Sequence, residues 1–167
     1  MSTTSKKDVI TCEGLETFEN ELNDLKVNKR KEIAQKIKEA REHGDLSENA
    51  EYDAAKDEQR DIEARISELE GFLKNVKVIY EDDVDTEKIG VGNKVKLLDI
   101  EFDEEVEYTM VGTTEVNLDQ GKISPESPVG KALMGAKVED VVDVNTQAGV
   151  FQYEVLDIKV GITNPDK

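Results

Sequence analysis

The hydrophobic positions in the first part of the chain recur at steps of three and four residues. Such steps place side chains on one face of an α-helix. The step from Leu25 to Ile33 passes through Lys29 and departs from the seven-residue repeat, so the sequence predicts a local fault in the apolar seam at that point. The members of this first series are Leu15, Phe18, Leu22, Leu25, Ile33, Ile37 and Ala40.

A second series alternates steps of three and four without a fault, which is typical of a coiled-coil seam. Its members are Tyr52, Ala55, Gln59, Ile62, Ile66, Leu69, Leu73 and Val76.

Residues 43–49 separate the two series and contain residues that favour a turn. Gly44 can end the first helix, and Asp45 or Ser47 can cap the second. Helices joined by so short a turn run antiparallel. We therefore predict an N-terminal coiled-coil hairpin domain over residues 1–80, a rod of about 45 Å whose tip projects into solvent.

Residues 81–167 have a different pattern, in which short stretches of alternating or apolar residues are separated by turn residues. Stretches 94–100, 106–111, 138–144 and 150–160 predict strands, and antiparallel pairing is the simpler arrangement. Ser127, Pro128 and Gly135 supply a cap, a first-turn proline and a terminal glycine, so they predict a short helix. The fold class is therefore α+β, with residues 81–88 as the linker to a second domain.

The charge balance limits the partners that this chain can bind. It has 22 basic and 39 acidic residues, a net charge of −17. Residues 78–167 are the more acidic part, with 8 basic and 20 acidic side chains, a net charge of −12. Tight binding to a phosphate backbone depends on Lys and Arg, so free DNA is not expected to be the principal ligand.

Cys12 is the only cysteine and His43 the only histidine. One chain therefore forms neither a disulfide nor a Cys/His zinc site, and any metal would need oxygen ligands. Cys12 is expected to be a small, partly buried apolar residue. The sequence has no secretion signal and no run long enough to span a membrane, which favours a cytoplasmic location.

Two segments of the chain resemble the Gre family of bacterial transcription elongation (transcript cleavage) factors. The sequence AREHGDLSENAEYDAAK at residues 40–56 is similar to the coiled-coil tip of that family, and ISPESPVGKALMG at residues 123–135 is similar to a loop and helix of its C-terminal domain. The two matches occur in the expected order, and the resemblance extends over almost the whole chain.

The resemblance implies a fold and a function. In this family an N-terminal coiled coil enters the secondary channel of RNA polymerase, and an FKBP-like C-terminal domain of residues 81–167 docks at the rim of the channel. The factor is not itself an enzyme but stimulates the polymerase to cleave its backtracked RNA.

The resemblance also implies the roles of individual residues. Asp45 and Glu48 would be the acidic tip residues that help to hold Mg²⁺, which is shared with the polymerase active site and is no cofactor of the free protein. Arg41 and Lys56 would meet the 3′ end of the nascent RNA. Ser127 and Pro128 would belong to the docking loop.

The sequence departs from the family pattern at one position and lacks a feature of one branch. Lys56 stands where some relatives have Arg, and a point charge without a bidentate fork makes the expected RNA contact weaker. The coiled coil lacks the dense basic patch of the GreB branch, which favours the GreA branch and short backtracked RNA. A hairpin that satisfies its own seam favours a monomer.

The spacing of the tip carboxylates supports two interpretations. Asp45 and Glu48 are three residues apart and can point the same way at a helix start. Two exposed carboxylates suit Mg²⁺ that is also bound by substrate phosphate and other ligands. The same spacing fits an N-cap with a capping box.

Other tip residues have structural alternatives. Arg41 and Lys56 also fit a solvated helix face, Tyr52 is expected to fix the tip by packing, and His43 is expected to complete the turn.

Three other functions remain open at the level of sequence. An inhibitory relative would block the polymerase channel without promoting cleavage, but it would not need Asp45 and Glu48. A prolyl isomerase or chaperone would need an aromatic-lined pocket, for which the second domain has few residues. A structural adaptor would be indifferent to the tip carboxylates. The aromatic residues available beyond Tyr80 are Phe102, Tyr108, Phe151 and Tyr153.

Overall fold

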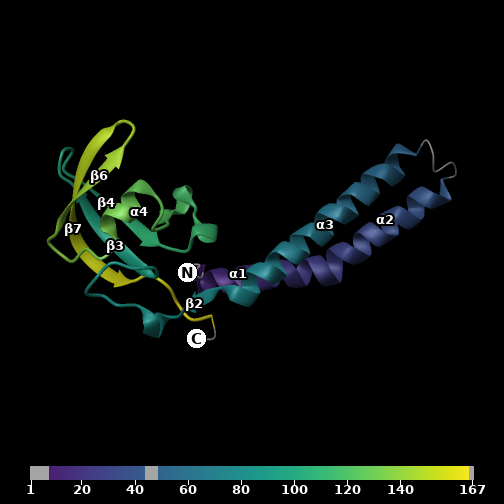
Figure 1. Ribbon diagram of the computed structural model, residues 1–167, viewed down its shortest axis with the longest axis horizontal. Coiled ribbons are helices and arrows are strands. Elements are labelled where there is room, and N and C mark those ends of the chain that lie inside the picture. The colour runs from purple at the N-terminus through teal and green to yellow at the C-terminus, as the bar shows by residue number, and fades with distance from the viewer. Residues whose placement is uncertain (1–7, 44–48, 166–167) are drawn as a thin grey trace, which may run out of the picture. The chain divides into compact units, whose positions relative to one another are not determined.

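The computed structural model describes residues 8–43 and 49–165 and divides the chain into two compact units (Figure 1). Residues 16–75 form the hairpin unit. The other described residues, 8–15 and 76–165, form the sheet unit. The predicted α+β class is confirmed, because one unit is helical and the other is built on a sheet with a short helix.

The hairpin unit consists of two long antiparallel arms (Figure 1). One arm comprises α1 (Cys12–Asp24), the π-helical turn η1 (Leu25–Lys29) and α2 (Arg30–Glu42), and the other is α3 (Ala50–Asn75). The predicted seams meet between the arms. Near the tip, a cluster of buried residues is joined by two partly buried ones, and the members are Ile33, Ile37, Ala55, Tyr52 and Ile62. Farther along, Phe18 and Phe72 pack edge to face with ring centroids 5.8 Å apart.

The π-helical turn lies at the predicted fault in the first seam. Leu25 and Ile33 are eight residues apart, one more than a heptad. A π-helical turn closes i→i+5 hydrogen bonds and so accommodates one extra residue within a helix. Because η1 absorbs that residue, the seams on both sides of it face α3, and Ile33 is 2% exposed.

Ion pairs between the arms line the flanks of the seam. Arg30 donates two hydrogen bonds of 2.8 Å to Glu63, and this contact lowers the pKa of the Glu63 carboxyl. The hydrogen bond from Lys26 likewise lowers the pKa of Glu70. These pairs are solvent-exposed, so they fix the register of the arms more than they stabilise them. The other pairs between the arms are Glu21–Arg65 and Lys36–Glu58.

The sheet unit contains a five-stranded sheet in the order β5-β4-β3-β7-β6. Its strands and one short helix are β3 (Asn93–Asp99), β4 (Glu104–Met110), β5 (Lys122–Ile123), α4 (Pro128–Leu133), β6 (Val141–Thr146) and β7 (Gly149–Val160). Three 3₁₀ turns connect elements: η2 (Glu81–Asp83), η3 (Thr113–Glu115) and η4 (Leu118–Gln120).

The four predicted strands and the predicted short helix are all present. The purely antiparallel arrangement was wrong in one place, because β5 pairs parallel to β4. The two-residue strand is too short to give a sequence pattern. The sheet and α4 enclose the core of the unit, whose fully buried members are Val95, Leu97, Met110, Leu133 and Val155.

A second, two-stranded sheet unites distant parts of the chain. Strand β1 (Val9–Thr11) pairs parallel with β2 (Lys77–Ile79), although more than 60 residues separate them. The side chain of Ile10 is fully buried there. The backbone N–H groups of Thr11 and Gly112 each donate a 2.9 Å hydrogen bond to Glu115, so this carboxylate ties β1 to the loop after β4.

The helix α1 starts directly after β1, within the sheet unit. Cys12 is 1% exposed, more deeply buried than expected, and this burial raises the pKa of its thiol. The carbonyl of Thr163 accepts a hydrogen bond from Cys12 Sγ at 3.4 Å, and the carboxylate of Glu13 accepts one from Thr163 N–H at 2.8 Å. The start of α1 is therefore held by the end of the chain.

Among the helices that the structure describes, none combines the length and the apolar character that crossing a membrane requires.

Candidate functional site at the tip of the hairpin

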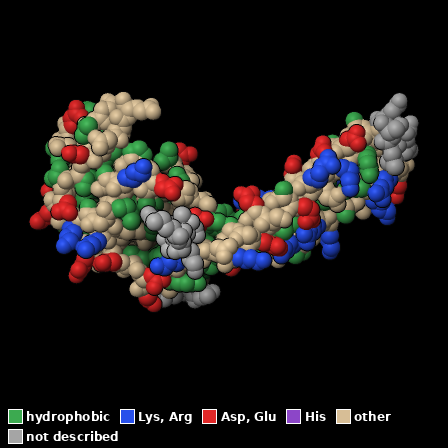
Figure 2. All heavy atoms as spheres, in the orientation of Figure 1, with side chains coloured by type: hydrophobic (Ala, Val, Ile, Leu, Met, Phe, Trp, Pro, Cys, Tyr) green, Lys and Arg blue, Asp and Glu red, His purple; other side chains and the backbone are tan. Residues whose placement is uncertain are grey.

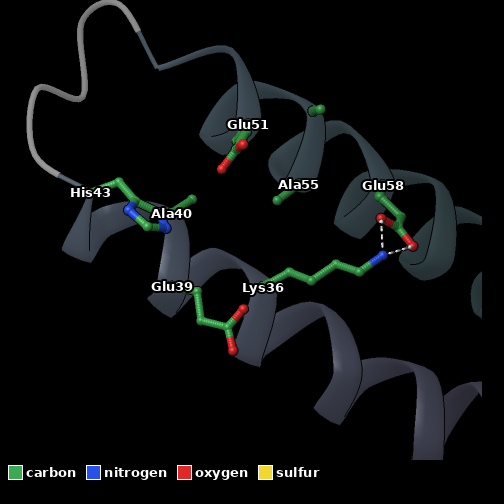
Figure 3. A pocket seen from close by; sticks show the side chains of 8 residues that line it. Lys36, Glu39, Ala40, His43, Glu51, Ala55 and Glu58 are labelled. Atoms are coloured by element: carbon green, nitrogen blue, oxygen red, sulfur yellow. Dashed lines mark hydrogen bonds and ion pairs between the residues drawn. The ribbon is translucent and has the colours of Figure 1, made fainter.

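The tip end of the hairpin is where α2 ends and α3 begins. The helix α2 ends at Glu42, and His43 is its C-cap, with its N–H bonded to the carbonyl of Ala40. Ala40 and Ala55 are buried on facing arms (Figure 3). The tip end is therefore an ordered frame for the segment between His43 and Asn49.

The side chain of Asn49 connects the two helices. Its Oδ1 accepts a 3.1 Å hydrogen bond from the N–H of Tyr52, in the first turn of α3. Its Nδ2 donates to the carbonyl of Ala40, in the last turn of α2, over 2.5 Å. Sequence reasoning missed this role, although Asn immediately before a helical series is a favoured N-cap residue.

The predicted tip carboxylates, Asp45 and Glu48, lie in residues 44–48, outside the described residues. The described residues do show which side chain caps α3. That helix begins at Ala50, later than predicted, and Asn49 caps it in place of Asp45 or Ser47. Asp45 is therefore not needed as the N-cap of α3, which was the basis of the capping interpretation.

The two predicted RNA-contacting cations lie on one flank of the hairpin. Arg41 and Lys56 each directly follow a seam residue, Ala40 and Ala55, and such positions of antiparallel helices face one another. The Arg41 guanidinium lies over the ring of Tyr52, 5.9 Å from its centroid. Lys56 Nζ donates a 3.0 Å hydrogen bond to Gln59.

No carboxylate among the residues described, 8–43 and 49–165, forms an ion pair with Arg41 or Lys56. Most other cations of the hairpin have an acidic partner, as Arg30 and Arg65 do. Basic side chains are visible toward the tip end of the hairpin in Figure 2. Among the residues that the structure describes, this flank therefore offers positive charge to an anion, on a chain that is acidic overall.

The packing role expected of Tyr52 is confirmed. Its partly buried ring packs against the cluster of Ile33, Ile37 and Ala55 while it also supports Arg41.

The opposite flank carries an open depression of about 320 Å³ (Figure 3). Lys36 and Glu58 form a 3.2 Å ion pair across it. His43 is exposed and lines the depression, and within the described residues it belongs to no group of three or more side chains that could hold a metal. Three glutamates and one lysine line this depression, so this flank does not share the positive character of the Arg41 flank. The remaining lining residues are Glu39, Ala40, Glu51, Ala54 and Ala55.

The predicted docking residues Ser127 and Pro128 form the start of α4. Ser127 Oγ accepts a 3.0 Å hydrogen bond from Gly130 N–H and donates one of 2.8 Å to the carbonyl of Ser124, so the predicted cap is confirmed. Pro128 is the first helical residue and is exposed. Its ring is available for contact, whereas the hydroxyl of Ser127 is occupied in shaping the loop.

The aromatic residues of the sheet unit are divided between the core and the surface. Tyr108 and Tyr153 pack against the buried core, and Phe102 is 61% exposed in the turn between β3 and β4. This division does not favour the aromatic-lined pocket that a prolyl isomerase would need.

The chain matches models of one protein family in both of its halves. Residues 8–78 match "Transcription elongation factor, N-terminal", and residues 83–160 match "Transcription elongation factor, GreA/GreB, C-term".

Curated relatives agree with this match over nearly their full length. Transcription elongation factor GreA from Lachnoclostridium phytofermentans is 60% identical over 154 residues, which cover 92% of this chain and 96% of that protein. The GreA of Acetivibrio thermocellus is 54% identical over 156 residues, covering 93% and 98%. Among solved structures, GreA factor homolog 1 of Thermus thermophilus is 32% identical, covers 92% of this chain and 99% of its own, and aligns with a TM-score of 0.42.

Proposed function

Since the chain belongs to the GreA/GreB family of transcription elongation factors, which stimulate transcript cleavage by RNA polymerase, we propose that it acts through the tip of its hairpin. The chain is not itself a nuclease but acts on the polymerase. In the proposal, the hairpin enters the secondary channel and brings Asp45 and Glu48 to the active site. The nascent RNA within the polymerase and the cytoplasmic location are part of the same proposal.

The observation that carries the proposal is the arrangement of the tip end. Two antiparallel helices lead to it, and α3 alone has 26 residues, or about 39 Å. The seam between the arms is satisfied within one chain, which supports a monomer and leaves the tip for a partner. The segment that carries Asp45 and Glu48 starts and ends at this frame.

The oxygen ligands available at the tip suit a magnesium ion that is shared with the polymerase. They are too few for an ion bound by the free protein alone. No group of three or more acidic, histidine or cysteine residues that could hold a metal exists within residues 8–43 and 49–165. Asp45 and Glu48 provide two carboxylates, whereas Mg²⁺ requires about six oxygen ligands. When bound between these carboxylates and the polymerase, Mg²⁺ would supply activation of water and neutralisation of phosphate charge. The free protein is therefore expected to bind Mg²⁺ weakly.

Arg41 and Lys56 suit contact with backtracked RNA. RNA phosphates are attracted to cations whose charge is not already neutralised by carboxylates. The stacking of Arg41 on Tyr52 restrains a long side chain before any ligand arrives, which reduces the entropy lost on binding. Lys56 contributes a point charge without a fork, so the larger share of specific contact is assigned to Arg41.

The sheet unit would bind the outer part of the polymerase through the loop before α4. The ring of Pro128 is exposed at the start of α4, and Ser127 fixes the backbone that presents it. A short, rigid loop of this kind loses little conformational freedom on docking.

The experiment that tests the proposal measures RNA shortening in stalled, backtracked polymerase complexes. The native chain is compared with the Asp45→Asn, Glu48→Gln double variant. Loss of carboxylates that hold a transition-state metal is expected to slow cleavage by at least a hundredfold, about 2.7 kcal/mol, without loss of polymerase binding. If both proteins bind and neither accelerates cleavage, the chain is a channel-occupying regulator and the proposal is wrong.

A further inference from the structure

Asn49 joins the two helices at the tip through two hydrogen bonds that need different atoms. The acceptor Oδ1 serves the N–H of Tyr52 at 3.1 Å, and the donor Nδ2 serves the carbonyl of Ala40 at 2.5 Å. A primary amide is the short, neutral side chain that offers both a donor and an acceptor on separate atoms. An N-cap alone would need only the acceptor.

The bond to Ala40 satisfies a group at the end of α2. The last carbonyls of a helix lack intrahelical partners, and His43 N–H reaches the Ala40 carbonyl only at 3.3 Å. The shorter bond from Asn49 comes from the other arm of the hairpin, nine residues away in the sequence. It therefore fixes the distance between the arms at the point where they end.

The two hydrogen bonds of Asn49 form a bridge between the helices, and the groups proposed to act on RNA lie next to this bridge. Arg41 directly follows Ala40, and its guanidinium lies over the ring of Tyr52, whose N–H bonds to Asn49. By chain connectivity, Glu48 directly precedes Asn49, and Asp45 lies two residues after His43. The bridge thus constrains both chain ends of the segment that carries the carboxylates.

We infer that Asn49 is a positioning residue for transcript cleavage, which holds the two ends of the tip together so that Arg41 and the tip carboxylates act on one site. This inference rests on the proposed function and deepens it. The positioning role depends on the donor Nδ2, because the acceptor Oδ1 already caps α3. Asn49 itself touches no reacting group.

Two variants separate the bridge from the cap. Asn49→Asp keeps the acceptor, and Asp caps helices as well as Asn does, but it has no donor for Ala40. Asn49→Ser keeps a capping oxygen without adding charge and is too short to span both helices. The matched control is Asn28→Ser, which removes the 2.7 Å amide hydrogen bond from Asn28 to Asp24 on the same hairpin, away from the tip.

Cleavage is measured at saturating factor over a range of Mg²⁺ concentrations, together with polymerase affinity and helix content by circular dichroism. Both Asn49 variants are expected to cleave at least tenfold more slowly and to need more Mg²⁺ for half-maximal rate, with affinity unchanged within about twofold. Asn28→Ser is expected to match the native chain. Native rates in both Asn49 variants, or losses that parallel weaker binding or lower helix content, would overturn the inference.

Nuclear magnetic resonance of the free protein tests the bridge without relying on cleavage. Backbone ¹⁵N relaxation at His43 is expected to show greater motion in Asn49→Asp, while Tyr52 stays ordered because α3 remains capped. Unchanged relaxation at His43 would contradict the bridge even if the native chain stimulates cleavage. Failure of the native chain in the cleavage assay would instead contradict the proposed function, and the relaxation data would still decide on the bridge.

Discussion

At the scale of single residues, the identity of a side chain matters most in this protein where it forms a hydrogen bond to the backbone. The lack of a side chain matters where two backbone segments approach closely. Ser127, Glu115 and Asn49 each bond to backbone groups that would otherwise lack partners. Sequence reasoning found Ser127, because a cap, a proline and a helix adjoin it. It missed the bonds from Asn49 to Ala40 and from Thr11 to Glu115, because these partners are distant along the chain.

Two glycines provide a test at the residue scale. A Cβ on Gly130 would overlap the carbonyl oxygen of Ser124, whereas a Cβ on Gly71, in α3, would meet no atom within 4 Å. Gly130→Ala is therefore expected to lower the free energy of unfolding by about 2–4 kcal/mol. Gly71→Ala is expected to raise it by about 0.5–1 kcal/mol, since Ala favours helix. Urea unfolding of each variant measures both, and equal effects would contradict the close approach at Gly130.

At the scale of elements, the arms of the hairpin are α-helical where the heptad repeat is regular. They depart from α-helical geometry where the repeat is interrupted. The predicted fault between Leu25 and Ile33 is the π-helical turn η1. The extra residue does not turn α2 away from its partner, since Ile37 and Ala40 remain buried. The turn therefore keeps the phase of the seam that places Arg41 on the flank of Lys56.

Deletion of Val27 tests this account of the π-helical turn. Val27 lies within η1 and is 50% exposed, and its removal shortens the step from Leu25 to Ile33 from eight residues to the seven of a heptad. We expect a continuous α-helix and a hairpin stabilised by about 1 kcal/mol, the net value of a recovered backbone hydrogen bond. Thermal unfolding followed at 222 nm measures the change. Deletion of Ala34, which lies in α2 beyond the turn, is the control and is expected to destabilise the hairpin. A loss of stability on deletion of Val27 as well would show that the turn does not compensate an insertion.

At the scale of the whole molecule, the two units are not divided by a single cut in the sequence. Residues 9–11 and the first turn of α1 belong to the sheet unit, through the parallel pairing of β1 with β2. The chain therefore enters the sheet unit, leaves it for the hairpin and returns.

Substitution of Ile10 tests whether β1 contributes to the stability of the sheet unit. The Ile10 side chain is fully buried, so Ile10→Ala is expected to lower the free energy of unfolding of that unit by about 2–5 kcal/mol. Val150→Ala, at a position 62% exposed in β7, is the control and is expected to change it by less than about 0.5 kcal/mol. Near-ultraviolet circular dichroism in a Tyr52→Phe background follows unfolding of the sheet unit, because the other three tyrosines, Tyr80, Tyr108 and Tyr153, lie in that unit. Equal stability of the two variants would mean that β1 contributes nothing to it.

The sequence by itself determined the features that depend on neighbouring residues. Helical periodicity, the fault at Leu25 to Ile33, the four longer strands and the cap at Ser127 arise from side chains within a few residues of one another. Only the tertiary structure decided which distant groups meet: β1 with β2, β5 parallel to β4, and Asn49 with Ala40. The physical reason is that a short strand or a single amide has no periodicity of its own. Its partner is selected by the packing of the rest of the chain.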